Sequence, residues 1–335
     1  MLKCGIIGCG RIVQQGHVSA FKTLRDRIEV VALADPAQGS LDAVGEALGV
    51  ERKYKDYREM LAKETLDFVD IATPHFAHRD NVVDAANAGV HILSEKPMAT
   101  NLKEADAMLA AVEKNGVQYC VLHNYIYGGA LKRAIALVRE GAIGEVFFIR
   151  SEGMGWGHYA GVEGFDPDWR TKMARGGGGC LIDNGYHNLY SAEYLMNSPV
   201  VSVYASVGTF VQPIDVDDLA VLLLKHKNGG TTSIQVSWAT KAGGVGVYEI
   251  HGTKGTLTFR RDDHPLALFR NETGEWEYPS IEVQYEGFTG IFHEFAKALE
   301  QGTEVPISGR RARHNLDIIV SAYESAKTGN VVAIS

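Results

Sequence analysis

Residues 1–17, MLKCGIIGCGRIVQQGH, decide the fold of this chain. A short apolar run ends at Gly8, and the residues from Arg11 to Leu24 place their apolar side chains at helical spacing. Gly8 and Gly10 therefore stand between a strand and a helix. Glycines at such a turn either make an ordinary tight turn or clear the backbone so that another group can approach it.

The first third of the chain continues this alternation of strands and helices. Near-continuous apolar strands are expected at 28–35, 66–74, 90–97 and 117–124, and helices at 40–50, 56–64, 78–90 and 101–116. Asn101 and Glu104 occupy capping-box positions at the start of the last of these helices. The alternation predicts a parallel sheet that is covered by helices on both faces.

The glycine turn is best explained by a dinucleotide. Gly8 permits the tight turn, Gly10 lets a pyrophosphate approach the backbone, and the following helix presents its N–H groups to that pyrophosphate. Asp35 ends the second strand, where it can accept hydrogen bonds from both ribose hydroxyls. Val13 stands where a third glycine or an alanine is usual. No Arg or Lys follows Asp35 in PAQGS to hold a 2′-phosphate, which favours NAD over NADP.

The second half of the chain changes character. A helix is expected at 130–144, and from Val200 onward the sequence indicates strands joined by short turns. These strands lie at 200–208, 218–229, 231–240, 245–252, 255–261 and 266–271, and closing helices are expected at 292–302 and 315–329. This pattern predicts an antiparallel sheet, with its own helices on one face and another subunit on the other.

Composition excludes several classes of protein. The chain has 335 residues and a net charge of -8, without the basic stripe of a nucleic-acid-binding surface. Its apolar runs are too short to span a bilayer, and residues 1–7 resemble a strand and not a leader, so we expect a cytoplasmic protein. The four scattered cysteines predict reduced thiols and no metal site.

Three stretches together resemble the glucose–fructose oxidoreductase and inositol dehydrogenase family, also called Gfo/Idh/MocA. They are GIIGCGRI at 5–12, EKPMA at 95–99 and GGGGCLIDNGYHNL at 176–189. ATPHFAH at 72–78 and EIHGTKGTL at 249–257 are similar to two further family elements, with His75 in place of an asparagine. The resemblance implies a Rossmann domain at 1–122, a substrate-binding and oligomerisation domain with an open, mostly antiparallel sheet at 123–335, a nicotinamide cofactor, and dimers or tetramers.

The resemblance also implies an activity, since most family members oxidise or reduce a carbinol on sugars, inositols and related polyols. Hydride transfer from a secondary alcohol needs a base, a positive group near the developing alkoxide, and a cofactor ring. His187 is the expected base, and Asp183, four residues earlier on the same helix face, orients it or binds substrate. Lys96 stabilises the alkoxide, and the resemblance implies a cis peptide bond between Lys96 and Pro97.

The other predicted contacts lie in the glycine turn, at strand ends and in loops. The cofactor-binding set is Gly8, Cys9, Gly10, Arg11, Ile12, Asp35, Thr73, Pro74, Glu95, Lys96, Asn124, Trp169 and Arg170. The substrate set is Lys96, Tyr125, His158, Arg170, Asp183 and His187, with Tyr159 beside His158 in a loop. Glu95 is expected near the nicotinamide ribose, and the resemblance implies that His78 is mainly structural.

Two other functions stay open. Some relatives retain NAD, oxidise a glycoside transiently, eliminate the aglycone, add water and reduce the sugar again. Such an enzyme needs a further group to abstract a ring C–H proton, and Tyr125, Tyr159 or His158 could serve. A non-catalytic NAD sensor is the other alternative, although such a sensor would not need Lys96, Asp183 and His187 together.

Overall fold

A computed structural model describes residues 1–158, 160, 166–242, 245–259 and 264–334. The chain forms two compact units, each built from segments that are separated in the sequence. Unit 1 contains Met1–Asn124, Tyr159–Gly177 and Tyr285–Leu316, and unit 2 contains Tyr125–His158, Gly178–Gln284 and Asp317–Ser335. The division into two continuous domains, with a boundary between residues 122 and 123, stays a prediction.

Unit 1 is organised around a parallel sheet of six strands, which confirms the predicted α/β class. The strands are β1 (Leu2–Ile7), β2 (Ile28–Ala34), β3 (Lys53–Tyr54), β4 (Phe68–Ile71), β5 (His91–Ser94) and β6 (Tyr119–Val121). Their order in the sheet is β3-β2-β1-β4-β5-β6, which is the Rossmann order with its change of direction between β1 and β4. In this order, the carboxyl ends of all six strands meet at one edge.

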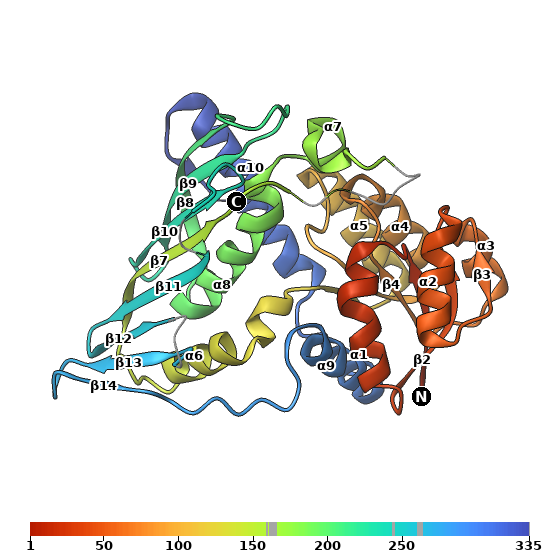
Figure 1. Cartoon of the computed structure of the whole chain (residues 1–335), viewed down its shortest axis with the longest axis horizontal. Helices are drawn as coiled ribbons and strands as arrows, with labels where there is room; N and C mark the ends of the chain where they lie inside the picture. The colour runs from red at the N-terminus through yellow and green to blue at the C-terminus, as the bar shows by residue number, and fades with distance from the viewer. Residues whose placement is uncertain (159, 161–165, 243–244, 260–263, 335) are drawn as a thin grey trace. The chain divides into compact units, whose positions relative to one another are not determined.

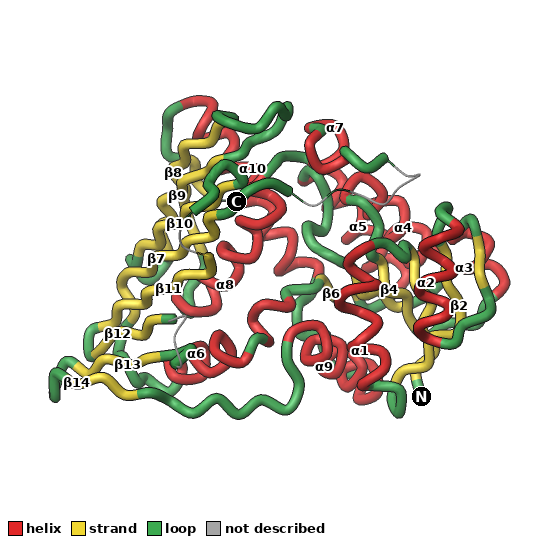
Figure 2. Tube along the Cα trace, in the orientation of Figure 1, coloured by secondary structure: helices red, strands yellow, loops and turns green. Residues whose placement is uncertain are grey.

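The helices of unit 1 form two groups that accompany the sheet (Figures 1 and 2). α1 (Val18–Thr23), α2 (Gln38–Leu48) and α9 (Gly287–Gln301) belong to one group, and α3 (Tyr57–Lys63), α4 (His78–Asn87) and α5 (Leu102–Asn115) to the other. A wide π-helical turn, Val13–His17, precedes α1, so the helix after the glycines is not uniformly α-helical. Shorter elements of this unit are the 3₁₀ turns His75–Ala77 and Trp169–Thr171, and α7 (Met173–Gly176). A further 3₁₀ turn, Asn124–Tyr127, has only its first residue in unit 1.

The predicted cap of α5 is present with one difference. Asn101 Oδ1 accepts a hydrogen bond of 3.0 Å from the Glu104 N–H, as a capping residue does. The Glu104 carboxylate, however, accepts from the N–H and the hydroxyl of Thr100 and not from the backbone of Asn101. Local sequence therefore predicted where the helix begins, while the return bond shifts by one residue.

Unit 2 contains a mixed, mostly antiparallel sheet, as expected. Its strands are β7 (Val146–Met154), β8 (Val200–Gly208), β9 (Leu219–His226), β10 (Thr231–Ser237), β11 (Val245–Gly252), β12 (Gly255–Thr258), β13 (Ala267–Arg270), β14 (Glu275–Glu277) and β15 (Val332–Ala333). The order is β14-β13-β12-β11-β7-β10-β9-β8-β15, and β7 runs parallel to β10. The pattern from Val200 onward did not include β7, which lies at the centre of the sheet.

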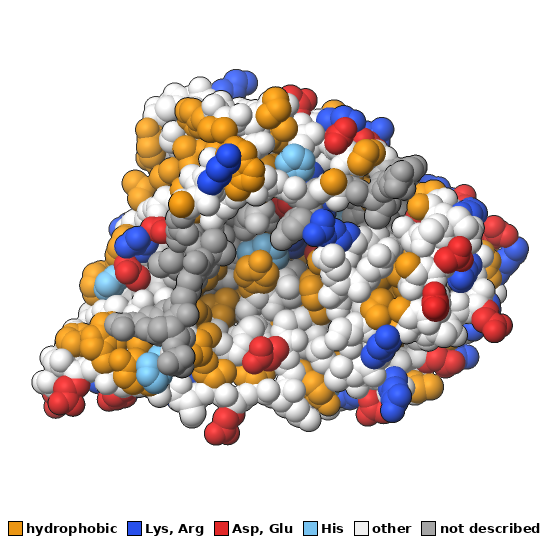
Figure 3. All heavy atoms as spheres, in the orientation of Figure 1, with side chains coloured by type: hydrophobic (Ala, Val, Ile, Leu, Met, Phe, Trp, Pro, Cys, Tyr) orange, Lys and Arg blue, Asp and Glu red, His pale blue; other side chains and the backbone are white. Residues whose placement is uncertain are grey.

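One face of this sheet is covered within unit 2. α8 (Tyr186–Met196) packs on β7 and β10 and contacts α6 (Gly129–Arg139), and a second π-helical turn, Leu181–Gly185, leads into α8 (Figure 1). The residues of α10 (Gly309–Thr328) from Asp317 onward also belong to unit 2. Along β9, Leu222 and Leu224 are buried, whereas Val221 and Leu223 are exposed. Hydrophobic side chains also appear on the surface near both ends of this sheet in Figure 3.

The cysteines, possible metal-binding clusters and possible membrane-spanning helices each bear on an expectation from the sequence. The four cysteines are buried free thiols. Within the described ranges, no group of three or more His, Cys, Asp or Glu side chains could hold a metal ion. No helix in the part of the chain that the structure describes combines the length and the apolar character needed to cross a membrane.

Candidate active site

The glycine turn lies at the carboxyl edge of the parallel sheet, directly after β1. Gly8 has a φ of 92°, and a Cβ atom there would lie 2.8 Å from the carbonyl carbon of Ala72. The Gly8 N–H donates to Ala34 O on β2, at 2.8 Å. Only glycine fits this conformation and this close approach. Gly10 is half-buried and Arg11 and Ile12 are exposed, while Cys9 and Val13 are buried.

Asp35 is held by the turn that it faces. Its two carboxylate oxygens accept hydrogen bonds from the N–H groups of Cys9 and Ala37, both at 2.7 Å. Burial raises the pKa of Asp35, while these N–H groups and the nearby Lys55 act in the opposite direction. The arrangement keeps an acceptor beside the glycine turn, where a ribose could use its remaining lone pairs.

Lys55 lies near Asp35, although the residues directly after Asp35 contain no Arg or Lys. Pairing of β3 with β2 joins the Asp35 N–H to Tyr54 O at 3.1 Å, which brings the next residue alongside. The Lys55 ammonium then donates to Pro36 O at 3.2 Å. The residues after Asp35 indeed contain no Lys or Arg, but strand pairing supplies one from twenty residues further along the chain.

The loops after β4 and β5 are tied together by His78. Its Nδ1 lies 2.8 Å from Pro97 O and its Nε2 lies 2.8 Å from Thr73 O. Thr73 also donates its hydroxyl proton to Asn81 Oδ1, and Pro74 follows it in the same loop. His78 is fully buried, and burial lowers its pKa. These contacts are those of a structural residue, and the Lys96–Pro97 peptide in the loop after β5 is cis.

Glu95 and Lys96 follow β5 at the same edge. Glu95 Oε2 accepts a hydrogen bond of 3.1 Å from the Lys96 N–H, and Oε1 lies 3.1 Å from Nε2 of His17. His17 in turn contacts Asp70 on β4. Sequence reasoning missed His17, although it lies in the helix that follows the glycines, and its spacing of four residues from the apolar Val13 and Phe21 could have marked it as buried.

Trp169 and Arg170 form a stacked pair in unit 1. Trp169 is buried and meets the ring of His75 edge-on, with the centroids 4.5 Å apart. The Arg170 guanidinium lies over the Trp169 ring at 4.2 Å. His75 Nδ1 is also 2.9 Å from Gly176 O, so the motif position at which His replaces asparagine anchors the glycine run. Asn124, the remaining predicted cofactor residue, begins the 3₁₀ turn after β6.

In unit 2, Gly178 and Gly179 pack close to Tyr323 and to Asp217, a buried carboxylate that the sequence did not reveal. A Cβ on Gly179 would lie 1.9 Å from Asp217 O, and one on Gly178 would lie 2.0 Å from the Tyr323 hydroxyl. The Asp217 carboxylate accepts from the N–H groups of Gly179 and Leu181 and from the Tyr323 hydroxyl. These bonds set the start of the helical segment that carries Asp183 and His187.

His187 is oriented by two tyrosines. Its Nδ1 lies 2.7 Å from the hydroxyl of Tyr190, and its ring stacks on Tyr125 with centroids 3.9 Å apart and planes inclined by 9°. The Tyr125 N–H donates to the same Tyr190 hydroxyl at 3.1 Å. Tyr190 is fully buried. It is three residues from His187 on one helix, a spacing that could have identified it.

The remaining predicted residues are placed as follows. Asp183 is half-buried in the π-helical turn before α8, so the plain helix that was expected there is locally wider. The His158 ring is 5.5 Å from that of Trp238, whose indole N–H donates to Asn184 Oδ1. Tyr159 lies outside the described residues. Lys96 belongs to unit 1, and Asp183, His187, Tyr125 and His158 belong to unit 2.

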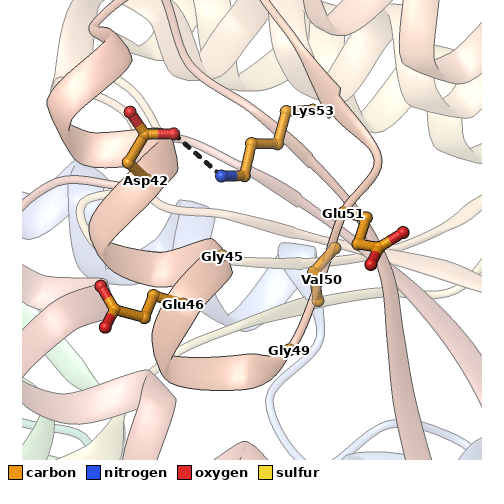
Figure 4. A pocket seen from close by; sticks show the side chains of 7 residues that line it. All are labelled: Asp42, Gly45, Glu46, Gly49, Val50, Glu51 and Lys53. Carbon is orange, nitrogen blue, oxygen red and sulfur yellow. Dashed lines mark hydrogen bonds and ion pairs between the residues drawn. The ribbon is translucent and has the colours of Figure 1, made fainter.

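A shallow hollow of about 510 Å³ is present elsewhere on unit 1 (Figure 4). Lys53 and Asp42 form an ion pair of 2.8 Å in its wall. It is lined by Asp42, Gly45, Glu46, Gly49, Val50, Glu51 and Lys53, and none of these was predicted as a site residue. The predicted site residues lie outside this hollow, in one group at the carboxyl edge of the parallel sheet in unit 1 and another near the start of α8 in unit 2.

A Rossmann sheet with a glycine turn and Asp35 at its carboxyl edge defines a dinucleotide-binding protein. Residues 2–123 match the model of an oxidoreductase family with an NAD-binding Rossmann fold, and residues 131–258 match the GFO/IDH/MocA C-terminal domain. The chain belongs to the Gfo/Idh/MocA family of oxidoreductases, which confirms the resemblance.

Three relatives illustrate the range of the family. The chain is 32% identical to D-apiose dehydrogenase of Paraburkholderia graminis over 346 aligned positions, which cover 99% of this chain and 89% of that protein. It is 26% identical to D-xylose 1-dehydrogenase (NADP(+)) 2 of Haloferax volcanii, covering 98% and 99%. A crystal structure of an oxidoreductase from Agrobacterium radiobacter, in complex with NAD+, L-tartaric acid and magnesium, superposes with a TM-score of 0.85 at 27% identity, covering 99% and 98%.

Proposed function

We propose that this protein is an NAD-dependent dehydrogenase that transfers a hydride between nicotinamide and a secondary hydroxyl of a sugar, an inositol or a related polyol. Membership of the family and the sugar dehydrogenases among the relatives support the reaction class. The observation that carries the proposal is the oriented imidazole of His187, whose Nδ1 is 2.7 Å from the Tyr190 hydroxyl. An imidazole held in this way exchanges its proton with substrate through Nε2.

The residues of the chain have distinct roles in this proposal. His187 takes the proton from the substrate hydroxyl, and the Tyr190 hydroxyl accepts the Nδ1–H bond that stabilises the imidazolium. The Lys96 ammonium stabilises the negative charge that develops on the substrate oxygen. Asp183 orients the base or binds a substrate hydroxyl, and Tyr125, His158 and Arg170 contact the substrate. A bound nicotinamide supplies the hydride acceptor.

The cofactor is proposed to lie along the carboxyl edge of the parallel sheet. The close approach that only glycine permits at Gly8 fits a pyrophosphate next to the backbone, and the acceptor Asp35 fits a ribose diol. Cys9, Gly10, Arg11 and Ile12 contribute backbone at the turn. At the other end, Thr73, Pro74, Glu95, Lys96, Asn124, Trp169 and Arg170 are proposed to surround the nicotinamide half.

We propose NAD as the preferred cofactor, because the Asp35 carboxylate would repel a 2′-phosphate. Lys55 opposes this repulsion, since its ammonium lies against Pro36 O at 3.2 Å. The balance between one carboxylate and one ammonium predicts a preference for NAD with measurable use of NADP. Among the relatives, the Haloferax enzyme is named for NADP(+), and the Agrobacterium structure contains NAD+, so the family as such does not decide the choice.

An absorbance screen for NADH formation tests the proposal. Purified protein is incubated with polyols, aldoses, uronic acids and glycosides, with NADP+ in parallel. We expect NADH formation with at least one sugar or polyol, and a loss of about 10²–10⁴-fold in kcat for His187→Asn and a large loss for Lys96→Ala. Lys103→Ala, at an exposed lysine on α5, is the matched control and should behave as wild type.

Two outcomes would replace the dehydrogenase with an alternative. Release of the aglycone from glycosides, without net NADH formation, would identify a redox-neutral glycosidase. Binding of NAD+ with no turnover of any substrate, and unchanged binding in Lys96→Ala and His187→Asn, would identify a sensor.

We also propose that the chain forms a homodimer or homotetramer through the outer face of the sheet in unit 2. Tyr204 on β8 and Leu223 on β9 are paired neighbours, and they are 44% and 49% exposed. Val201 and Val221 extend this apolar surface along the same strands. Sedimentation analysis of Leu223→Lys should show a smaller assembly than wild type. The buried free thiols fit a reducing compartment, which supports the cytoplasm as the place of action.

A further inference from the structure

A buried imidazole connects the helix after the glycine turn to the end of β5. His17 ends the wide turn Val13–His17, and its side chain is fully buried. Nδ1 lies 2.7 Å from Asp70 Oδ2, and Nε2 lies 3.1 Å from Glu95 Oε1. Carboxylate oxygens only accept hydrogen bonds, so both ring nitrogens must donate. His17 is therefore an imidazolium between two carboxylates.

The surroundings of His17 keep this charge out of water. The rings of Phe288 and Phe292 on α9 lie 4.6 Å and 5.1 Å from the imidazole. Burial alone lowers the pKa of His17, but Asp70 and Glu95 together raise it to about 10. The Cys4 thiol also faces Asp70, and burial and Asp70 raise its pKa, so it adds no charge. Buried ionic clusters often stabilise a fold no more than apolar side chains would, so this one calls for another explanation.

The two carboxylates are not equivalent. Asp70 lies within β4 and has no exposed surface, and among the residues that the structure describes its second oxygen has no hydrogen-bond partner. Glu95 lies at the carboxyl edge and is 9% exposed, and its second oxygen accepts from the Lys96 N–H. Asp70 thus holds His17 from within the sheet, and His17 in turn holds Glu95. With both oxygens held, the plane of the Glu95 carboxylate is fixed at the edge of the sheet.

We infer that His17 is a positioning residue, which holds the Glu95 carboxylate in the orientation that accepts hydrogen bonds from the nicotinamide-side ribose of the cofactor. This inference rests on the proposed function, in which Glu95 faces that ribose and Asp35 faces the adenosine ribose. His17 acts only through Glu95 and touches neither cofactor nor substrate. Its loss should weaken the contacts of one half of the dinucleotide and leave those of the other half intact.

Two double variants of equal charge separate this role from a merely structural one. In His17→Gln, the amide nitrogen can replace Nε2 and keep the bond to Glu95, whereas in His17→Asn it can replace only Nδ1. Each is combined with Asp70→Asn, so that one positive and one negative charge are removed together and the net charge of the cluster stays the same in both variants. Binding of NAD+, ADP-ribose and 5′-AMP is then measured by calorimetry, because only the first two contain the second ribose.

For each of the three ligands, the Gln variant is expected to have the same affinity as the wild type. The Asn variant should bind NAD+ and ADP-ribose about tenfold more weakly, which corresponds to one hydrogen bond to a charged group, with 5′-AMP unchanged. Equal weakening of all three ligands, or no difference between the two variants, would overturn the inference. If wild-type protein bound none of them, the proposed cofactor function itself would fail, which is a distinguishable result.

A measurement on the unaltered protein covers the case in which the variants do not fold. With ¹⁵N-labelled histidine, both ring nitrogens of His17 should carry protons in the free protein. Saturation with NAD+ or ADP-ribose should shift the Nε2 signal through Glu95, and 5′-AMP should not. An Nε2 signal that is unmoved by NAD+, or moved equally by 5′-AMP, would contradict the assigned role.

Discussion

Asp217 offers a stringent test of how the chain segment that carries Asp183 and His187 in unit 2 is held in place. It is buried, and its carboxylate accepts from Gly179 N–H at 2.7 Å, Leu181 N–H at 2.8 Å and the Tyr323 hydroxyl at 2.7 Å. The Cys180 thiol lies 3.3 Å from the same carboxylate, and burial and Asp217 raise its pKa, which keeps it a donor. Four donors thus converge on two oxygens.

The cost of Asp217→Asn can be worked out from these contacts. Whichever way the new amide is turned, its NH₂ group faces a donor. The less costly orientation leaves Leu181 N–H without an acceptor, because the Cys180 thiol on the same side can turn to Val236 O. The other orientation would leave both Gly179 N–H and the Tyr323 hydroxyl unpaired. An unpaired buried donor costs about 1–3 kcal/mol, and the remaining bonds lose their charge assistance, so we expect a loss of about 2–4 kcal/mol.

Tyr323→Phe removes only one donor, and the carboxylate keeps its others, so it should cost about 1–2 kcal/mol. The double variant should cost less than the sum, because the two groups share one bond. Urea denaturation followed by circular dichroism measures each value. Glu275→Gln, an exposed carboxylate on β14, is the matched control. A change below about 0.5 kcal/mol for Asp217→Asn, or strict additivity in the double variant, would refute the reasoning.

Three further predictions concern the cofactor, the base and pH. Lys55→Met should lower kcat/KM for NADP about fivefold and leave kcat/KM for NAD within twofold of wild type. The reason is that an ammonium beside Asp35 stabilises a bound 2′-phosphate by about 1 kcal/mol. An unchanged ratio of the two kcat/KM values would contradict this prediction. Tyr190→Phe should lower kcat about tenfold with little change in KM. It should also move the acidic limb of the pH profile of kcat to lower pH, because protonated His187 loses a hydrogen-bond acceptor. A change in KM alone would indicate a role of Tyr190 in substrate binding instead. The pKa of His17 is raised from 6.5 to about 10, so its contribution to stability is fully present below pH 6.5 and is lost as pH rises towards 10. Over this range, the denaturation midpoint of the wild type should therefore fall more steeply with pH than that of the double variant His17→Gln/Asp70→Asn.

The local sequence was sufficient for much of unit 1. The apolar runs of the strands, the 3.6-residue period of the helices, the glycine that follows β1 and the capping pair at Asn101 depend on neighbouring residues only. Most elements of this part could therefore be predicted, and the short strand β3 was missed. Asp35 was placed for the same reason, since it ends a strand directly beside the turn. The assignment of Asp183 and His187 depended on a family resemblance together with their four-residue spacing.

What the sequence could not determine was decided by pairing between distant segments. β7 occupies the centre of its sheet although Arg150 and Glu152 interrupt its apolar pattern, because β10 and β11 cover both its edges. Lys55 lies near Asp35 only because β3 pairs with β2. Each of these contacts joins residues that the periodicity of one element cannot relate.

The same distinction applies to the groups that hold the site. The sequence by itself determined the elements, the glycine turn and the chemical types of the expected acid, base and cation. Only the tertiary structure decided that His17 lies between two carboxylates and that Asp217 receives the glycine run. The physical reason is that burial removes competing water, so polar groups far apart in the chain must satisfy one another, and sequence spacing does not encode which partners they find.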